Sequence, residues 1–363
     1  MAKSSFLNNA YVIYLKPMGI LTGVTDFFGL DIGTTAIRVV ELHGGGKVRG
    51  LYRYGQISID PKVSESDSKA DAAKIAQAVK QVITEAKIST RNVAVGIPSN
   101  QTFTAVVDVD KLSPAELAKT IQYQADSLIP TPLAESKIDW ALLGDSPKES
   151  NKVEILLSSV TNEFIEKRLD TLESIGLNVI AFEPDSLALS RSILAPDATL
   201  PQMILDIGSR STDLIIAMNG APHLVRSIPT GSDTLVKAAV QNLGIDANQA
   251  TQFVFKFGLS KDKLEGQIYN AIAGSVDVLF TEIEKSIKFF QTRYTSARLE
   301  RIIVTGAASV LPEFPLYLAN KFGVNVEIGN AWRNVAFPQD KQNELLSVSN
   351  HFGVAAGLAA RVE

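Results

Sequence analysis

The stretch from Leu30 to Leu42 reads "LDIGTTAIRVVEL", and a close copy, "LDIGSRSTDLII", runs from Leu205 to Ile216. In each copy an apolar run ends in Asp, an apolar residue and Gly, and small polar residues then lead into a second β-branched run. This pattern predicts two strands joined by a tight turn, because glycine permits backbone conformations that other residues avoid. The same β-hairpin occurs twice, so the sequence predicts a duplicated α/β fold.

The composition is that of an ordinary globular protein. The chain has 363 residues, of which 45% are hydrophobic and 20% charged. A net charge of -4 offers no field to attract nucleic acid or anionic lipid, so we expect neither as a partner. No cysteine is present, which excludes disulfides and thiolate chemistry. His43, His223 and His351 lie far apart in sequence, so we expect ordinary surface or loop residues rather than a metal site or proton relay.

The N-terminal segment lacks the regular hydrophobic pattern of the rest of the chain. The apolar segment from Tyr11 to Val24 is interrupted by Pro17 and Gly19, so it is too short to span a membrane and does not resemble a signal peptide. Because it shows no helical or strand period, we expect residues 1–25 to form an extension outside the folded core. The alternative is that "YVIYL" adds a strand to an exposed sheet edge.

Hydrophobic periodicity divides the rest of the chain into two halves, each with a subdomain. The predicted units are the first half (26–102 and 184–200), an inserted subdomain of strand-helix-strand-strand-helix-strand order (103–183), the second half (201–232 and 299–363) and a helical subdomain (233–298). In the insert, "SPAELAKTIQYQADSLI" begins with Ser113 as a cap, Pro114 at the first helical position and Glu116 at the third. This capping box predicts a helix.

Each Asp-x-Gly turn is a candidate phosphate site. Backbone N–H groups at such a turn can hold phosphate oxygens, and hydroxyl side chains add donors. Asp31 and Asp206, at the mouths of the turns, are suited to hold a hydrated Mg²⁺. One such turn is also a common strand end without a ligand, but two in corresponding positions favour phosphate binding. The predicted phosphate contacts are Gly33, Thr34, Thr35, Gly208, Ser209, Arg210, Ser211 and Gly231.

These motifs carry a family resemblance. "DIGTTAIRVVEL", "DIGSRSTDLII" and "VTGAASVLPEF" resemble, in order, the first phosphate, second phosphate and adenosine motifs of the actin, heat-shock-chaperone and sugar-kinase superfamily. The inserted subdomain resembles that of FtsA and, more closely, that of the PilM family, the cytoplasmic actin-like proteins of type IV pilus assembly. "SPAELAKTIQYQADSLIPTPLAESKIDW" and "IPTGSDTLVKAAVQNLGIDANQA" are similar to PilM stretches. From Phe27 onward, the resemblance implies an actin-like duplicated ATPase fold whose two halves enclose a cleft for ATP and Mg²⁺.

The adenosine side departs from the family pattern. In PilM-like proteins an Ala-Glu-x-x-Lys helix holds the ribose and the adenine, but Thr251 and Val254 replace that Glu and Lys here. A register change would let Gln252 or Lys256 compensate, and Lys256 is the candidate adenosine contact.

Two further positions also differ. The expected Gly-Gly of the adenosine motif is Gly306 followed by Ala307, whose methyl group would crowd the nucleotide. The acidic residue expected in the helix of the insert is Gln124, and a Gln can still orient an attacking water. The candidate adenosine residues are therefore Gly306, Ala307 and Lys256, and the candidate catalytic residue is Gln124.

Two classes of function stay open on this pattern. The first is a nucleotide-dependent scaffold with little or no ATP turnover, and the second is a pseudo-ATPase of the same fold. An FtsA-like cell-division protein or a sugar kinase has less support, since we expect no amphipathic membrane helix and find no sugar-binding Asp.

The resemblance also implies partners and a location. The implied partner is the cytoplasmic N-terminal peptide of a PilN-like inner-membrane protein, held in a groove between the first half and the insert. Tyr123, Leu128 and Ile129 are candidate groove residues, although such spacing is also typical of a core. Pilus assembly ATPases and a second copy of the chain, as a homodimer or polymer, are further implied partners. The location would be cytoplasmic, at the face of the inner membrane.

Overall fold

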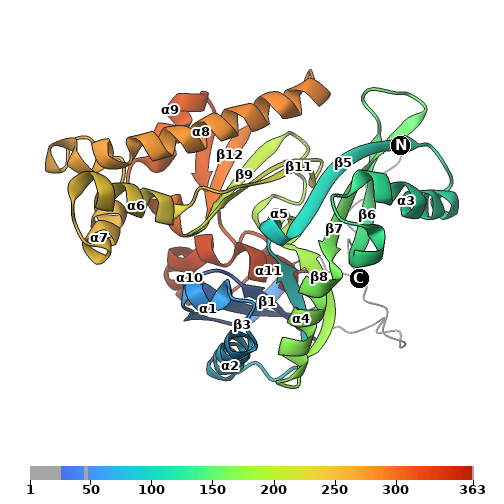
Figure 1. Ribbon diagram of the computed structural model, residues 1–363, viewed down its shortest axis with the longest axis horizontal. Coiled ribbons are helices and arrows are strands. Elements are labelled where there is room, and N and C mark those ends of the chain that lie inside the picture. Colours follow the sequence, from blue (N-terminus) through green and yellow to red (C-terminus); the bar gives the residue numbers. More distant parts are fainter. Residues whose placement is uncertain (1–25, 45–47, 362–363) are drawn as a thin grey trace.

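The computed structural model describes residues 26–44 and 48–361, and its two halves are each built on one mixed β-sheet (Figure 1). The predicted extension, residues 1–25, and the alternative that it adds a strand both lie outside the described residues. Among the described ranges, no helix combines the length and the apolar character needed to cross a bilayer.

Three sheets contain the strands. The first sheet consists, from edge to edge, of β14 (Val335–Ala336), β3 (Arg49–Ser58), β2 (Ala36–His43), β1 (Phe28–Ile32), β4 (Asn92–Ile97) and β8 (Asn178–Pro184). The second consists of β11 (Ala221–Ile228), β10 (Thr212–Met218), β9 (Gln202–Ile207), β12 (Arg301–Thr305) and β13 (Asn325–Ile328). The third consists of β5 (Thr102–Asp110), β7 (Lys152–Thr161) and β6 (Ser136–Asp145).

Helices occupy the segments between these strands. They are α1 (Pro61–Ser64), α2 (Lys69–Glu85), α3 (Pro114–Leu128), α4 (Asn162–Glu173), α5 (Asp185–Ile193), α6 (Ser232–Leu243), α7 (Ala247–Phe257), α8 (Gln267–Arg293), α9 (Phe314–Phe322), α10 (Gln342–Val348) and α11 (Gly353–Ala359). Short 3-10 turns are η1 (Ser99–Gln101), η2 (Leu133–Glu135), η3 (Leu264–Gly266), η4 (Ala307–Val310), η5 (Gln339–Lys341) and η6 (Ser349–His351).

Strand pairing shows the duplication. In the first sheet β1 pairs antiparallel with β2 and parallel with β4. In the second sheet β9 pairs antiparallel with β10 and parallel with β12. The duplicated α/β fold predicted from the two Asp-x-Gly hairpins is therefore confirmed.

Helices α5 and α11 lie between the two main sheets. Their apolar residues share one core with residues of both sheets, for example Ala188 of α5 with Ala94 of β4 and Ile204 of β9. The close approach requires glycine, because a Cβ on Gly29 of β1 would lie 2.3 Å from the carbonyl oxygen of Ala355 in α11. Helices α2 and α4 cover the outer face of the first sheet, and α8 and α9 cover that of the second. Sheets and helices thus alternate in layers.

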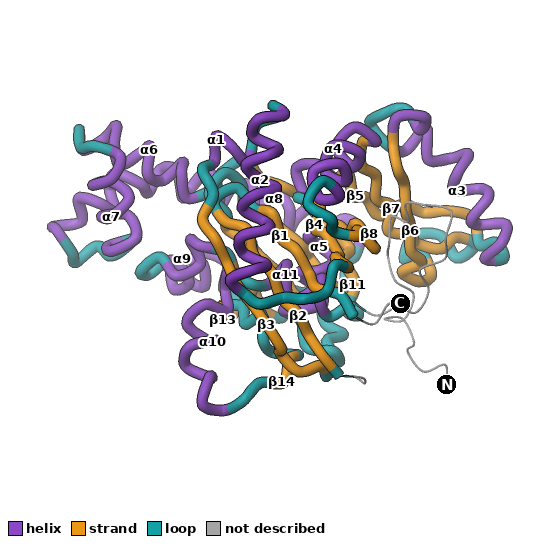
Figure 2. The backbone as a smooth tube through the Cα atoms, turned by 90° about the horizontal axis from the view of Figure 1, so that it is seen from below, coloured by secondary structure: helices purple, strands orange, loops and turns teal. Residues whose placement is uncertain are grey.

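The inserted subdomain is shorter than predicted. Its sheet contains only β5, β7 and β6, and α3 packs on one face of it. The apolar side chains Ile165 and Leu172 of α4 join the core of the first half, and β8 pairs with β4 of the first sheet. The boundary predicted at residue 183 is therefore corrected to the end of β7. The insert lies at the end of the molecule opposite α6 and α7 (Figures 1 and 2).

Part of the C-terminal segment belongs to the first half and not, as predicted, to the second. Residues 299–363 were expected in the second half, but β14 pairs with β3 of the first sheet. Trp332 and Leu345 pack against Val40 of β2, and α11 contacts β1, β2 and β4. The chain therefore crosses back to the first half after β13.

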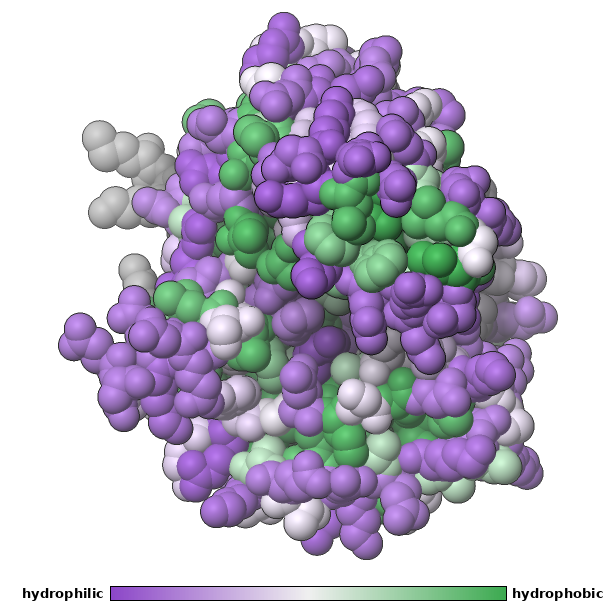
Figure 3. All heavy atoms as spheres, turned by 90° about the vertical axis from the view of Figure 1, so that its left-hand side faces the viewer, coloured by the Kyte–Doolittle hydropathy of each residue, from purple (hydrophilic) through white to green (hydrophobic). Residues whose placement is uncertain are grey.

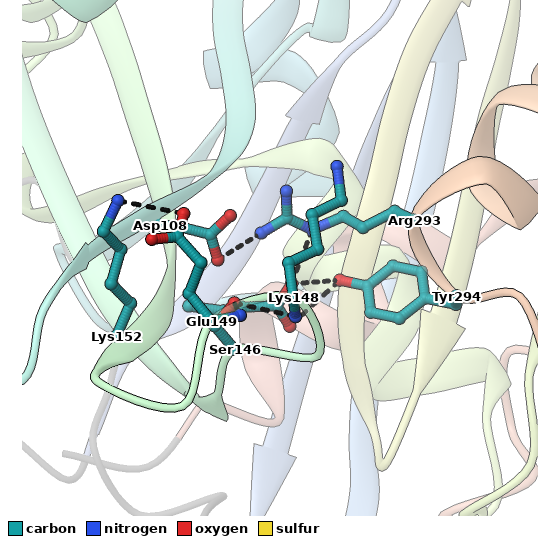
Figure 4. Close-up of polar contacts among 8 residues, drawn as sticks. Asp108, Ser146, Lys148, Glu149, Lys152, Arg293 and Tyr294 are labelled. Atoms are coloured by element: carbon teal, nitrogen blue, oxygen red, sulfur yellow. Dashed lines mark hydrogen bonds and ion pairs between the residues drawn. The ribbon is translucent and has the colours of Figure 1, made fainter.

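A polar cluster attaches the insert to the second half (Figure 4). Nε of Arg293, at the end of α8, donates to Glu154 Oε1 at 2.5 Å, and Nη2 donates to Asp108 Oδ1 at 2.6 Å. The hydroxyl of Tyr294 donates to Glu154 Oε1 at 3.0 Å. Glu154 is buried on β7, so these donors compensate a carboxylate that has left water. We call Asp108, Glu154, Arg293 and Tyr294 the insert clamp.

Candidate functional site

The first Asp-x-Gly turn joins β1 to β2 and is held tightly. Gly33 N donates to the carbonyl oxygen of Ala36 at 3.0 Å, and a Cβ on Gly33 would lie 3.1 Å from that oxygen. Thr34 is half-buried and Thr35 is exposed. The Ser64 hydroxyl at the end of α1 donates to the Thr34 carbonyl oxygen at 2.6 Å. The turn is therefore supported from α1 and open on its other side.

The second turn joins β9 to β10 with the same backbone bond. Gly208 N donates to the carbonyl oxygen of Ser211 at 2.9 Å. The first turn of α6 packs directly against it, because Ser232 N donates to the Gly208 carbonyl oxygen at 3.0 Å. A Cβ on Gly231 would lie 2.4 Å from the Ser209 carbonyl oxygen, so no larger residue fits there. The N-terminus of α6 thus holds the second turn in place.

The two acidic residues occupy corresponding places with different neighbours. Across its hairpin Asp31 faces Arg38, whereas Asp206 faces Asp213. Arg38 Nη1 lies 3.5 Å from Asp31 Oδ2, which is an ion pair. Asp213 Oδ1 instead accepts a hydrogen bond from the Ser227 hydroxyl at 2.7 Å. The first turn is compensated in charge, and the second is doubly acidic.

This difference appears in the protonation of the carboxylates. Desolvation raises the pKa of Asp31, and the charge of Arg38 opposes that rise. Desolvation, together with the charges of Asp213 and Asp31, raises the pKa of Asp206 to about 7. Because the charge of Asp31 acts on Asp206, the structure brings the two turns into one site.

Asp185 is a further carboxylate of this site, and the two turn motifs did not predict it. It is the first residue of α5, directly after β8. Desolvation, followed by the charge of Asp31, raises its pKa well above the usual range. Its Oδ1 is buried and has no hydrogen-bond partner among the described residues, and a Cβ on Gly96 would lie 2.2 Å from that oxygen. The signal in the sequence is the acidic helix start in "FEPDSLALS", directly after a buried strand.

The charges at this site fit a divalent cation. Asp31, Asp185, Asp206 and Asp213 place four carboxylates at this site, and desolvation raises the pKa of each. Repulsion from neighbouring carboxylates adds to the rise for Asp185 and Asp206. Oxygen ligands of this kind suit Mg²⁺, which usually keeps several waters. Within the described ranges, no three of these carboxylates gather ligand atoms within 4.8 Å of one another. The residues therefore fit a hydrated Mg²⁺ rather than one coordinated by protein alone.

A buried hydroxyl in the second turn fits a phosphate group. Ser209 Oγ is buried and makes no hydrogen bond to any described residue. Buried hydroxyl groups are normally paired, and a phosphate oxygen is a strong acceptor. The face of the molecule that carries α6 and α7 is hollowed between the two halves (Figure 3). A phosphate group entering there would meet a donor that has no other partner.

Arg210 points across the site instead of toward a phosphate position. Its Nε and Nη2 lie 2.9 and 3.1 Å from the two carboxylate oxygens of Glu65, the residue after α1. Its Nη1 lies 3.4 Å from Asp233 Oδ2. The side chains of Arg210 and Glu65 are 41% and 42% exposed, so this is a surface ion pair between the two halves. The predicted phosphate contact is therefore engaged elsewhere in this structure.

The third turn follows β12 and packs against the second. Gly306 has a φ of 82°, and a Cβ there would lie 2.5 Å from Asp206 Oδ1. Gly306 N donates to the carbonyl oxygen of Asn350 at 2.8 Å, which fixes the turn. Ala307 is half-buried directly after it. The structure thus brings Gly306 and Ala307 beside the second phosphate turn.

Helix α7 carries the positions of the missing Glu and Lys. Val254 is fully buried in the core of the second half, and Thr251 is exposed with its hydroxyl donating to the Ala247 carbonyl oxygen at 2.8 Å. Lys256 is exposed, and its Nζ lies 5.3 Å from the ring centroid of Phe257. The adenosine role of Lys256 stays a prediction.

Comparisons with known proteins identify the family. A family model described as type IV pilus assembly protein PilM matches residues 29–363. The chain belongs to the PilM family. A chain of the PilM-PilN type IV pilus biogenesis complex is 25% identical, with a TM-score of 0.76 over 92% of this chain and 97% of that one.

Two further solved structures share the fold. The ethanolamine utilization protein EutJ from Carboxydothermus hydrogenoformans is 14% identical, with a TM-score of 0.55 over 92% of this chain and 88% of that one. MreB5 of Spiroplasma citri bound to AMPPNP is 13% identical, with a TM-score of 0.51 over 92% of this chain and 94% of that one. The actin-like duplicated fold and the resemblance to PilM are confirmed.

Gln124, the catalytic candidate taken from the PilM resemblance, is not at this site. It lies on the exposed side of α3, whose buried face packs on the three-stranded sheet of the insert. That sheet is separate from the sheets that carry the phosphate turns, and α3 lies at the far end of the molecule (Figure 1). The structure therefore gives Gln124 no position from which to orient a water at the phosphate turns.

The three candidate groove residues differ in their exposure to solvent. Tyr123 is 85% exposed on α3, whereas Ile129 is buried in the core of the insert. Leu128 is half-buried and packs against the same core. Of the three, only Tyr123 is open to a partner of this PilM-family chain.

Proposed function

We propose that the protein is a nucleotide-dependent scaffold of type IV pilus assembly that binds Mg-ATP between its two halves. Support comes from the acidic residues of both turns meeting in one site, and above all from Ser209 Oγ, a buried donor without a partner at the second turn. The phosphates would lie against the turns at Gly33 and Gly208. Mg²⁺ would be held through water by Asp31 and Asp206, where it would neutralise charge on the phosphate groups.

We expect little or no ATP turnover. Phosphoryl transfer requires a nucleotide held in one orientation. Val254 is buried in the core and Thr251 is turned to solvent, so neither supplies the polar contact to ribose and adenine that the PilM pattern has there. This observation favours the second candidate function, a pseudo-ATPase of the same fold that recruits partners without nucleotide chemistry.

Calorimetric titration of the purified chain with Mg-ATP separates the two candidates. The scaffold predicts saturable binding that Asp206→Ala removes, and the absence of any heat of binding up to millimolar ATP would favour the pseudo-ATPase. In the same samples, phosphate release at ~1 per second or faster, the lower end of common enzyme turnover, would contradict the expected lack of hydrolysis.

We also propose that the insert contributes to the site that recruits a PilN-like inner-membrane protein. The related complex contains both PilM and PilN, and Tyr123 offers an exposed aromatic side chain on α3. Aromatic side chains often anchor such interfaces. The chain would then act in the cytoplasm, at the inner membrane through this partner. Pilus assembly ATPases and self-association stay further predictions.

Fluorescence anisotropy with a labelled peptide from the cytoplasmic N-terminus of the cognate PilN-like protein tests this assignment. Tyr123→Ala is expected to weaken peptide binding at least about tenfold, the cost of a truncated anchor residue. Leu316→Ala is the matched control, because Leu316 is an exposed apolar residue of α9 in the other half. Equal loss in both variants, or none in Tyr123→Ala, would contradict a role for α3.

A further inference from the structure

A second cluster of potential metal ligands lies at the other end of the first hairpin. Glu41 and His43 are two residues apart on β2, so their side chains lie on the same face of the sheet. The β1–β2 register, with Phe28 opposite Glu41, places Asp26 opposite His43. One ligand atom from each of Asp26, Glu41 and His43 lies within 4.8 Å of the others. We call these residues the hairpin-end cluster.

Glu41 is the buried member of the cluster and is incompletely satisfied. It is 1% exposed, its Oε1 lies 2.9 Å from His43 Nε2, and its Oε2 has no hydrogen-bond partner among the described residues. Arg53, opposite Glu41 on β3, does not compensate it: its guanidinium lies 4.3 Å from the Tyr52 ring centroid and donates to the Tyr52 carbonyl oxygen. A carboxylate taken out of water with a free oxygen requires a charged partner.

His43 is positioned to supply the nitrogen ligand. Its ring stacks on Tyr52 with the centroids 3.9 Å apart and the planes at 17°, and its Nε2 faces both carboxylates. Nε2 lies 4.0 Å from Asp26 Oδ1. The side chains of His43 and Asp26 are 48% and 67% exposed, so a cation and its waters have access from solvent.

We propose that Asp26, Glu41 and His43 bind a divalent transition-metal cation, with Zn²⁺ as the best match. One imidazole nitrogen and two carboxylate oxygens form a ligand set that zinc accepts, with water in the fourth position. Zinc–ligand bonds of about 2.1 Å in tetrahedral geometry place ligand atoms about 3.4 Å apart. This spacing lies between the 2.9 Å from His43 Nε2 to Glu41 Oε1 and the 4.0 Å from Nε2 to Asp26 Oδ1. The proposal departs from the expectation that the histidines are ordinary surface residues.

This site is distinct from the one between the phosphate turns. Asp26 precedes β1, whereas the first phosphate turn follows it, so the two sites are separated by the length of the strand, roughly 20 Å. The ligands also differ in kind, because imidazole nitrogen favours zinc while an all-oxygen set suits Mg²⁺. A cation at the hairpin-end cluster would bind Asp26 to β2 and so fix the point where the chain enters the first sheet.

Titration of the chelator-treated full chain with ZnCl₂, without nucleotide, tests the proposal. One equivalent of Zn²⁺ is expected to bind and to raise the thermal midpoint. Glu41→Gln and His43→Gln are expected to weaken binding about tenfold or more. Asp206→Ala, which alters only the phosphate site, is the matched control and should bind Zn²⁺ like the parent. Co²⁺ gives a second readout, since its visible spectrum reports nitrogen coordination and should change in His43→Gln.

The opposite results would overturn the proposal. No binding by the parent, or equal affinity in Glu41→Gln and His43→Gln, would show that Glu41 and His43 form an ordinary ion pair. Loss of Zn²⁺ binding in Asp206→Ala alone would assign the ion to the phosphate site. If the Glu41 variant fails to fold, Asp26→Asn replaces it, because the exposed Asp26 side chain can change without disturbing the core. Unchanged affinity in Asp26→Asn and His43→Gln would then refute the site.

Discussion

The β1–β2 and β9–β10 hairpins have the same backbone and opposite electrostatics. Both turns close with a bond from the glycine N–H to a carbonyl oxygen three residues later, at 3.0 and 2.9 Å. Yet the residue facing the acidic residue of the turn is Arg38 in the first hairpin and Asp213 in the second. The two hairpins therefore share a backbone conformation but differ in the charge of the side chain opposite the acidic residue. We infer that the second hairpin is the principal cation site, while both turns contact phosphate.

Removing the carboxylate of the second turn should have the largest effect. Asp206→Ala is expected to weaken Mg-ATP binding at least about hundredfold, or ~2.8 kcal/mol, because the cation loses its main ligand. Asp31→Ala should cost less, because it frees Arg38 to meet a phosphate oxygen. Calorimetric titrations with ATP in Mg²⁺ and in chelator measure both. Equal losses in the two variants would contradict the proposed difference between the two hairpins. Parent-like binding by Asp206→Ala would show that Asp206 does not hold the cation.

The pH dependence of binding should report the doubly acidic hairpin. The cation requires deprotonated Asp206, whose pKa is raised to about 7, so Mg-ATP affinity should rise as the pH increases through about 7. Asp213→Asn removes a like charge and should move that midpoint to lower pH. Titrations from pH 5.5 to 8.5 measure it, with Arg38→Gln expected to move the midpoint the other way. A midpoint that neither variant moves would contradict this account.

The same raised pKa predicts the sign of the stability change without nucleotide. The folded state holds the proton of Asp206 more tightly than the unfolded state, so its stabilising contribution is complete below about pH 4 and is lost as the pH rises through about 7. Denaturant unfolding of the parent should therefore show a free energy of unfolding that falls over this window. The fall should be smaller in Asp206→Asn, and an identical fall would assign it to other groups.

The unpartnered hydroxyl of the second turn should matter only when phosphate is bound. Ser209→Ala is expected to weaken ATP binding about tenfold, as for a hydrogen bond to a charged group. The free energy of unfolding without nucleotide should stay within about 0.5 kcal/mol, since no bond is lost. Ser174→Ala, in an exposed position after α4, is the control. Unchanged ATP affinity in Ser209→Ala would separate this hydroxyl from the phosphate site.

The smallest effect is expected for the ion pair that joins Arg210 of the second hairpin to Glu65 in the first half. Arg210 and Glu65 are both partly exposed, so a double-mutant cycle with Arg210→Ala and Glu65→Ala should give a coupling energy of about 0.2 to 1 kcal/mol. Thr35, which takes the place of Arg210 in the first hairpin, is the control position. A coupling well above this range would mean that the pair dominates closure of the two halves.

Local pattern was enough to predict many elements. The apolar spacing in α2 places Ile75, Val79 and Val82 in the core, as expected for one helical face. The capping box of Ser113 and Glu116 at the start of α3 is present. Such signals depend on neighbours in sequence, so they can be read without knowing the rest of the fold.

Other features depend on residues far apart in sequence. Nothing local shows that α4 packs in the core of the first half or that β8 pairs in the first sheet. The insert clamp likewise joins Arg293 to residues 139 and 185 positions away. The pairing of Glu41 and His43 with Asp26 also required the register of two strands. These errors and omissions share one cause, which is that packing partners are chosen by the whole fold.

The sequence by itself determined that one hairpin occurs twice and that each copy offers a glycine turn with an acidic residue, because these are properties of short segments. Only the tertiary structure decided how the two copies differ. It set Arg38 opposite Asp31 and Asp213 opposite Asp206, and it brought Asp185 beside them from another strand end. The physical reason is that the energy of a charge depends on the groups around it and on its distance from water, and both are set when separate parts of the chain pack together.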